Sequence, residues 1–304
     1  MSDDRMAHHL RPRAIALFDR FTHVHQDRRA FMAELTALAG SAVAAEALLA
    51  AIAPNHAAAA QVPADDPRLR TQVITRPAAQ GRVLTGYLAR PARARGRRGV
   101  VMVVHENRGL NDHIRDVARR VALAGYIAFA PDFLTTAGGT PANEDDARAM
   151  IGRLDLAATV ADGAAVVQGF RRFAGANGRV GVVGFCWGGA MVNRLAVAAG
   201  PDMAAGSAFY GPAPDPALAG GVKAALQLHY AGNDPRVNGT ADAWVAGLRA
   251  AGVAVDRFDY PGTEHAFHND TSLARYQAAA ARLAWERTLA LFARTLGAAG
   301  SKAP

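Results

Sequence analysis

The stretch RVGVVGFCWGG (residues 179–189) decides the fold. Its first half is a run of glycine and β-branched residues, typical of a strand that is buried on both faces of a parallel sheet. Its second half places Cys186 between Gly184 and Gly188, in the pattern Gly-x-nucleophile-x-Gly. In this pattern a strand turns at once into a helix, so the neighbours two positions away must be small for the two elements to approach. The stretch therefore predicts a parallel α/β sheet with a nucleophile at a strand end.

The residues on both sides of this stretch alternate between strand and helix patterns. Strands are expected at 81–88, 99–104, 126–130, 179–185, 222–230 and 253–260. Helices are expected at 112–124, 143–151, 156–173, 187–199, 239–251 and 272–296. This alternation predicts an α/β fold with one doubly wound, mostly parallel sheet, in which residues 81–88 form an edge or antiparallel strand.

Polar residues follow several of these strands, where ligands of such sheets bind. They are His105, Glu106, Asp132, Cys186, Asp234 and His265. Cys186, Asp234 and His265 occur in the chain order of nucleophile, acid and histidine found in α/β hydrolases. We expect Asp234 to orient His265, and His265 to take and return a proton. The backbone N–H groups of Trp187 and Asn107 are the candidates for an oxyanion hole.

Five stretches of the sequence resemble the dienelactone hydrolase family. They are VVHENRGL (103–110), APD (130–132), GFCWGG (184–189), AGND (231–234) and GTEHAF (262–267). The resemblance extends over residues 71–297 and implies an α/β-hydrolase fold. No cofactor is expected, because the sequence has no GxGxxG motif after the first strands and no Walker lysine. The resemblance implies a triad of Cys186, His265 and Asp234 that hydrolyses a lactone or activated ester through a thioester. It also implies that Glu106 holds the resting thiol away from His265 until substrate binds.

The residues expected to contact the substrate depart from the family pattern. Family members that act on dienelactone hold its carboxylate with two arginines, one after the strand that precedes Asp132 and one four residues beyond the triad histidine. Here the first loop, residues 133–139, has no arginine, and the second position is Asn269. Arg108 and Arg236 are the candidates to supply the charge instead. The sequence therefore argues against dienelactone itself and predicts another small ester or lactone as the substrate.

The cysteine count and the charge distribution exclude several other classes. A single cysteine excludes an internal disulfide, CxxC redox chemistry and cysteine-rich metal sites. The formal charge is +8, but residues 1–100 alone carry a net charge of +7. Five arginines in this part lie in one stretch without aromatic residues, and we expect a solvated loop there: Arg90, Arg93, Arg95, Arg97 and Arg98. No nucleic-acid partner is expected, because stacking aromatics and a recognised motif are missing.

The N-terminal part permits two interpretations. Residues 14–35 have apolar residues at helical spacing, and residues 36–60 are rich in alanine. A folded helical extension of a cytoplasmic protein is the favoured interpretation. The stretch DRRAFM (27–32) resembles a twin-arginine export signal, and the alternative is a leader that directs the protein to the periplasm. A stable membrane anchor is not expected, because Glu46 and Pro54 interrupt the apolar stretch.

The domain boundary is expected in QVPADDPRLR (61–70), which has the composition of a linker. Residues 1–70 would then form the extension or leader with its linker, and residues 71–298 the hydrolase domain. The sequence does not determine the oligomeric state.

Two other functions are compatible with the same residues. One is a member of the fold that binds a small ligand without turnover. The other is a metal-dependent hydrolase, with His105, Glu106, His265 and His268 as the ligands. The spacing of these residues does not match a helix-borne HExxH motif, so no metal is expected.

Overall fold

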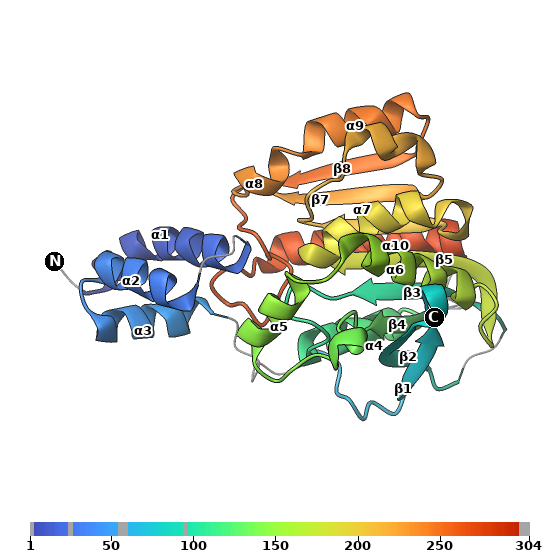
Figure 1. Cartoon of the computed structure of the whole chain (residues 1–304), viewed down its shortest axis with the longest axis horizontal. Helices are drawn as coiled ribbons and strands as arrows, with labels where there is room; N and C mark the ends of the chain where they lie inside the picture. The colour runs from blue at the N-terminus through green and yellow to red at the C-terminus, as the bar shows by residue number, and fades with distance from the viewer. Residues whose placement is uncertain (1–2, 24–26, 54–59, 94–95, 298–304) are drawn as a thin grey trace.

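The computed structural model describes residues 3–23, 27–53, 60–93 and 96–297. These residues form an eight-stranded sheet with the strand order β1-β2-β4-β3-β5-β6-β7-β8. Strand β2 pairs antiparallel with both β1 and β4, and all other neighbouring strands are parallel. The mostly parallel α/β sheet expected from the sequence is therefore confirmed (Figure 1).

The strands have bounds close to those expected. They are β1 (Leu69–Pro77), β2 (Val83–Pro91), β3 (Arg98–Val104), β4 (Ile127–Pro131), β5 (Ala176–Phe185), β6 (Ala205–Phe209), β7 (Ala225–Ala231) and β8 (Val255–Tyr260). The helices of the same part of the chain are α4 (Asp112–Leu123), α5 (Glu144–Ile151), α6 (Leu156–Phe170), α7 (Trp187–Ala198), α8 (Pro235–Asn238), α9 (Ala241–Ala250) and α10 (Ala278–Leu296). The helix expected at 239–251 corresponds to α9, and α8 is a separate short helix before it.

Helices cover both faces of the sheet and give it two apolar layers. Helices α6, α7 and α9 pack on one face, where Phe170, Leu195 and Trp244 are fully buried. Helices α4 and α10 pack on the other face, where Val117 and Phe292 are fully buried. Because helices lie on both faces, the central strands are buried on both sides, which explains their almost continuous apolar sequences.

Helix α7 lies unusually close to the sheet, and glycines permit this approach. A Cβ atom at Gly188 would lie 2.4 Å from the carbonyl oxygen of Val104 and 2.5 Å from that of His105. A Cβ atom at Gly184 would lie 2.2 Å from the carbonyl oxygen of Gly188. A side chain at either position would collide with backbone atoms, which cannot move away as a flexible side chain can. Both positions of the nucleophile pattern therefore require glycine.

Two strands were not expected from the sequence. Strand β6 has the sequence AGSAF, whose small residues have little intrinsic preference for a strand. It forms because β5 and β7 pair with it on both sides. Strand β1 is half exposed and begins at Leu69, so the boundary expected between residues 70 and 71 falls inside a strand. The segment before β1 is also held in place, since Asp116 accepts a hydrogen bond from the N–H of Val62 at 2.8 Å.

The N-terminal residues form three helices: α1 (Asp3–His23), α2 (Arg28–Ala39) and α3 (Ala42–Ile52). The helical spacing of residues 14–35, which predicts one amphipathic helix, is divided between α1 and α2. The prediction of one helix is wrong, because α1 ends at His23 and Asp27 caps a new helix by accepting a hydrogen bond from the N–H of Ala30 at 2.9 Å. Phe18, Phe21 and Phe31 form the centre of the small core between the helices. Figure 1 places these helices beyond the end of the sheet to which the arrowheads of β3, β7 and β8 point.

The arginines of residues 90–98 lie partly in strands. Arg90 lies in β2 and Arg98 begins β3, so the expected loop is shorter than its arginines suggest, and Arg95 lies outside the described residues. No described helix is by itself long and apolar enough to cross a membrane; α2 and α3 reach that length and composition only together, with a bend of 105° between them.

We expect the substitution Gly188→Ala to lower the free energy of unfolding by about 2 kcal/mol, because the added methyl group collides with backbone oxygens of β3 and the loop after it. Urea unfolding followed by circular dichroism measures this loss. The matched control is Gly220→Ala, since a Cβ atom at Gly220 meets no atom within 4 Å. Equal stability of the two variants would contradict the close packing of α7 on the sheet.

Candidate active site

Cys186 lies at the turn between β5 and α7, with the backbone angles φ 55° and ψ −115°. A positive φ is strained for a residue with a side chain. Two hydrogen bonds hold the turn: the N–H of Cys186 donates to Phe209 at 3.0 Å, and the N–H of Ala190 donates to the carbonyl of Cys186 at 3.0 Å. The turn lifts the sulfur above the end of the sheet, where 5% of the residue is exposed.

Asp234 and His265 come from the loops after β7 and β8 and form a hydrogen bond. Nδ1 of His265 lies 2.5 Å from Oδ2 of Asp234. The other oxygen of Asp234 accepts a hydrogen bond from the N–H of Val237 at 3.2 Å, which fixes the carboxylate at the start of α8. Burial opposes the charge of Asp234, but the hydrogen bond and charge of His265 outweigh it and lower the pKa of this carboxyl.

The second ring nitrogen of His265 has no hydrogen-bond partner among the described residues. His265 offers a nitrogen that lies within 4.8 Å of Sγ of Cys186. Burial favours the neutral ring, but the negative charges of Asp19 and Cys186 and the hydrogen bond with Asp234 raise the pKa of His265 to about 10. The structure therefore brings together the three residues that the sequence singled out as nucleophile, base and acid.

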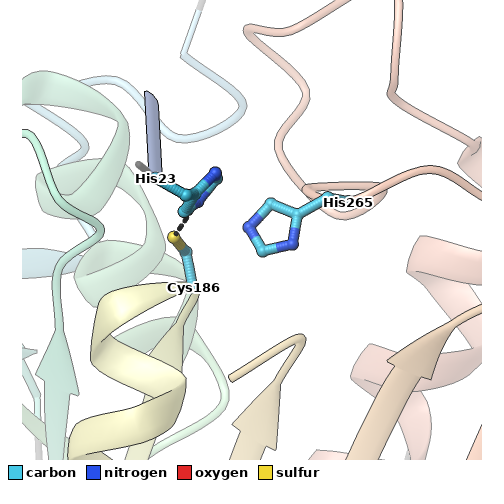
Figure 2. Close-up of side chains that lie close together, drawn as sticks. All are labelled: His23, Cys186 and His265. Carbon is cyan, nitrogen blue, oxygen red and sulfur yellow. Dashed lines mark hydrogen bonds between the residues drawn. The ribbon is translucent and has the colours of Figure 1, made fainter. Parts of the chain in front are cut away.

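A second histidine lies even closer to the sulfur. Nε2 of His23, the last residue of α1, lies 3.0 Å from Sγ of Cys186, and its ring centre is 4.5 Å from that of His265 (Figure 2). Sequence analysis missed His23 because it assigned the region only to an amphipathic helix. The spacing of Asp19 and His23, four residues apart on one helix face, was the available signal.

The two histidines lower the pKa of the Cys186 thiol. Burial by itself raises this pKa, since it disfavours the thiolate. The positive charges of His23 and His265 and the hydrogen bond with His23 outweigh burial, and the pKa falls to about 6. The lowered pKa favours the thiolate, which is the nucleophilic form of cysteine.

Glu106 lies near this group but does not bond to the sulfur. Its Oε2 accepts a hydrogen bond from Nδ2 of Asn269 at 2.8 Å, and its Oε1 is buried without a hydrogen-bond partner among the described residues. In this structure the thiol hydrogen bond is made by His23. The expected role of Glu106 in holding the thiol stays a prediction, and Asn269 contacts Glu106 where a substrate contact was expected.

The backbone N–H groups of Trp187 and Asn107 lie at the candidate oxyanion hole. Both residues line the pocket beside Cys186. Neither N–H donates a hydrogen bond to any residue that the structure describes. Trp187 is the first residue of α7, where a helix leaves its N–H groups unpaired and favours negative charge. These two donors can therefore bind an oxygen atom that becomes negatively charged.

The pocket has a volume of about 620 Å³ and opens beside Cys186. Of the arginines proposed to bind substrate, Arg236 lines it, whereas Arg108 forms an ion pair with Glu144 and lies 5.7 Å from the ring centre of Phe18. Arg148 and Arg194 also line the pocket and were not expected. Its apolar wall is formed by Ile151, Leu154, Leu156, Trp187, Ala190 and Met191.

The residues considered as metal ligands do not gather in the described part of the chain. Nδ1 of His105 lies 2.7 Å from the carbonyl oxygen of Glu106, and the His105 ring stacks on Trp187. The His268 ring stacks on Phe185, with 4.9 Å between the ring centres. The described sets with ligand atoms within 4.8 Å of one another are His23–Cys186–His265 and Asp19–Asp234–His265. They share only His265 with the proposed four.

Comparison with known proteins places these features in a family. The chain is 49% identical over 110 residues to the "Putative hydrolase fragment YghX" of Escherichia coli K12, which covers 36% of this chain and 94% of that protein. It is 32% identical over 242 residues to the "Putative carboxymethylenebutenolidase" of Salmonella typhi, covering 75% of this chain and 88% of the relative.

The fold has a close counterpart among solved structures. A "Putative Dienelactone Hydrolase" of Klebsiella pneumoniae superposes with a TM-score of 0.67 at 29% identity, covering 74% of this chain and 99% of the other. The model of the dienelactone hydrolase family matches residues 84–296. These residues extend from Leu84 in β2 to the end of α10 and include every residue expected in the triad, and the chain belongs to the dienelactone hydrolase family of α/β hydrolases.

Proposed function

We propose that this hydrolase cleaves lactones or small carboxylic esters with Cys186 as the nucleophile, His265 as the proton carrier and Asp234 as its orienting acid. The observation that carries the proposal is the 2.5 Å hydrogen bond between Asp234 and His265 beside a cysteine held at a strained turn. Membership of the dienelactone hydrolase family supports the same chemistry.

Acylation of Cys186 is the first half of the proposed reaction. The thiolate attacks the carbonyl carbon of the substrate, and the N–H groups of Trp187 and Asn107 stabilise the negative oxygen. As the bond between the carbonyl carbon and the leaving oxygen breaks, protonated His265 donates its proton to that oxygen. The acyl group stays on Sγ as a thioester, and His265 is left neutral.

Hydrolysis of the thioester is the second half. The thioester carries no negative charge, so one of the causes that raise the pKa of His265 is removed. Neutral His265 can then take a proton from water while the water oxygen attacks the acyl carbon. The bond between carbon and sulfur breaks, the acid leaves, and the thiolate and protonated His265 are restored.

The pocket favours a substrate with an apolar body and a polar or anionic end. Its apolar wall suits the body of such a substrate, and the guanidinium groups of Arg194 and Arg236 line the same pocket. Arg236 is exposed and makes no ion pair with a described residue, so it can bind a substrate carboxylate. This assignment is consistent with a substrate other than dienelactone itself.

We expect Cys186→Ala to reduce turnover of p-nitrophenyl esters and enol lactones by on the order of 1,000-fold or more, because the nucleophile is lost. His265→Ala should still accept an acyl group from a p-nitrophenyl ester, whose leaving group needs no proton, but should fail to hydrolyse the thioester. Intact mass spectrometry of this variant should then show one stable acyl group on the single cysteine.

Cys186→Ser serves as the control, since it keeps the size of the side chain and removes only the thiol. Undiminished turnover in Cys186→Ala would contradict the proposed nucleophile. Ligand-dependent shifts of the melting temperature without any turnover by the wild-type protein would instead favour a binding protein.

The pH dependence of kcat/KM should have two limbs for an alkyl ester. Below a pH of about 6 the thiolate gains a proton and the rate falls, since the pKa of Cys186 is lowered to about 6. Above a pH of about 10 the rate falls again, because His265, with its pKa raised to about 10, loses the proton that the leaving alcohol requires. A p-nitrophenyl ester is the control, because its profile should lack the upper limb; an upper limb of equal depth for both esters would argue against proton donation by His265.

A further inference from the structure

The contact between His23 and Cys186 requires a proton between the two side chains. Nε2 and Sγ are 3.0 Å apart, which is too close for two lone pairs to face each other. Either the thiol donates to a neutral His23, or a protonated His23 donates to the thiolate. In both cases Cys186 and His23 share one proton across this contact.

The other nitrogen of His23 is committed as a donor. Nδ1 lies 2.8 Å from the carbonyl oxygen of Asp19 and 3.0 Å from Oγ1 of Thr22, whose hydroxyl itself donates to the same carbonyl. Oδ1 of Asp19 lies 3.4 Å from this nitrogen and adds a negative charge. His23 is also the last residue of α1, where the unpaired carbonyl groups of a helix favour a positive charge. With Nδ1 occupied by these contacts, Nε2 is the ring nitrogen that faces the sulfur.

The hydrolase domain holds the end of α1 at this position. Nδ2 of Asn107 donates to the carbonyl of Thr22 at 2.7 Å, and a guanidinium nitrogen of Arg148 donates to the carbonyl of Phe21 at 2.5 Å. The same guanidinium lies 4.0 Å from the ring centre of Phe21. Two carbonyl groups at the end of α1 therefore receive donors from the domain that carries Cys186.

A second set of contacts fixes the preceding turn of α1. Arg275 is buried, lies 3.7 Å from Oδ1 of Asp19 and covers the ring of Phe18 at 5.3 Å. Arg108 lies on the same ring, 5.7 Å from its centre. The hydrolase domain therefore contacts Phe18 and Asp19 as well as the end of α1. These contacts together fix the position of His23.

We propose that His23, supplied by the N-terminal helices, is a second catalytic histidine that keeps Cys186 as a thiolate and leaves His265 free to carry protons. This inference rests on the proposed function of Cys186. In each turnover His23 retains its proton beside the sulfur. His265 gives its proton to the leaving oxygen and regains one from water, so protons and charges balance over the cycle.

Other charged and titratable groups also surround the sulfur and the two histidines. They are Asp19, Glu106, Tyr210, Asp234 and Arg275. Among them, Asp19 and Asp234 stabilise the positive charges of the histidines, whereas Glu106 and Tyr210 provide no positive charge to the thiolate. Arg275 is a further cation, and its ion pair is with Asp19. Arg148, Arg194 and Arg236 line the pocket beside Cys186. The removal of His23 should therefore raise the pKa of the Cys186 thiol, and the other groups should not compensate for this loss.

The test is the rate of alkylation of Cys186 by iodoacetamide as a function of pH, in full-length wild-type protein and in His23→Gln. Cys186 is the single cysteine, so the mass gained reports on it alone. The midpoint of the wild-type profile should lie at a pH of about 6. In His23→Gln it should rise by about two pH units, because the thiolate loses its nearest cation and hydrogen-bond donor.

The same variant separates the two halves of the reaction. With about a tenth of the thiol ionised at pH 7, the acylation burst from a p-nitrophenyl ester should slow about tenfold, while hydrolysis of the thioester should change less than about threefold. At about pH 9 the burst rate should return toward that of the wild type. A purely structural role of His23 predicts no such recovery at high pH.

Arg20→Ala is the matched control, because Arg20 lies one turn earlier on α1 and pairs with Glu34 at the surface of the helical bundle. It should leave both the alkylation profile and the burst unchanged. Melting temperatures show whether each variant is folded, and His23→Asn provides a second variant if His23→Gln is unstable.

An unchanged alkylation midpoint in His23→Gln would overturn the inference. Faster alkylation with the same midpoint would also overturn it, since His23 would then only cover the sulfur. Alkylation does not require turnover, so this result is independent of whether Cys186→Ala abolishes hydrolysis. The failure of the inference and the failure of the proposed function are therefore distinguishable.

Discussion

The positive φ of Cys186 is the constraint on which the rest of the site depends. Such a conformation costs about 1–3 kcal/mol, and the surrounding structure must supply that free energy. It does so through the backbone hydrogen bonds on both sides of Cys186 and through the contact of Gly188 with the backbone of β3. The strain is concentrated at one residue, and it places a buried sulfur at the end of the sheet. There the sulfur lies beside the N–H group of Trp187, which has no hydrogen-bond partner among the described residues.

The charges around that sulfur explain why the pKa of Cys186 is lowered although the thiol is buried. A buried thiolate is unfavourable by itself, and it needs a positive charge at close range. The 2.5 Å hydrogen bond with Asp234 stabilises a positive charge on His265. Oδ1 of Asp19 lies 3.4 Å from Nδ1 of His23. Each histidine thus has its own carboxylate, but the two pairs come from parts of the chain that are more than two hundred residues apart.

The sequence predicted the parts of this arrangement that depend on local patterns. The turn at Cys186 could be predicted because a strand followed at once by a helix restricts residue types at fixed positions. Asp234 and His265 could be placed because they follow strands of one parallel sheet. His23 could not, because no local pattern states where a separate helix will dock. Strand β6 was missed for a related reason, since its small residues form a strand only when β5 and β7 lie on both sides.

The contact between His23 and Cys186 has a consequence for the N-terminal helices themselves. If a protonated His23 stabilises the thiolate, then by thermodynamic linkage the thiolate stabilises the docked position of α1 by the same free energy. In the proposed reaction, acylation removes the negative charge from the sulfur, and this part of the docking free energy is lost while the thioester is present. Asn107 and Arg148 still hold the carbonyl groups at the end of α1 in that state. The helix therefore stays attached, but its hold on the sulfur is weakest at the stage of the reaction when water must reach the acyl group.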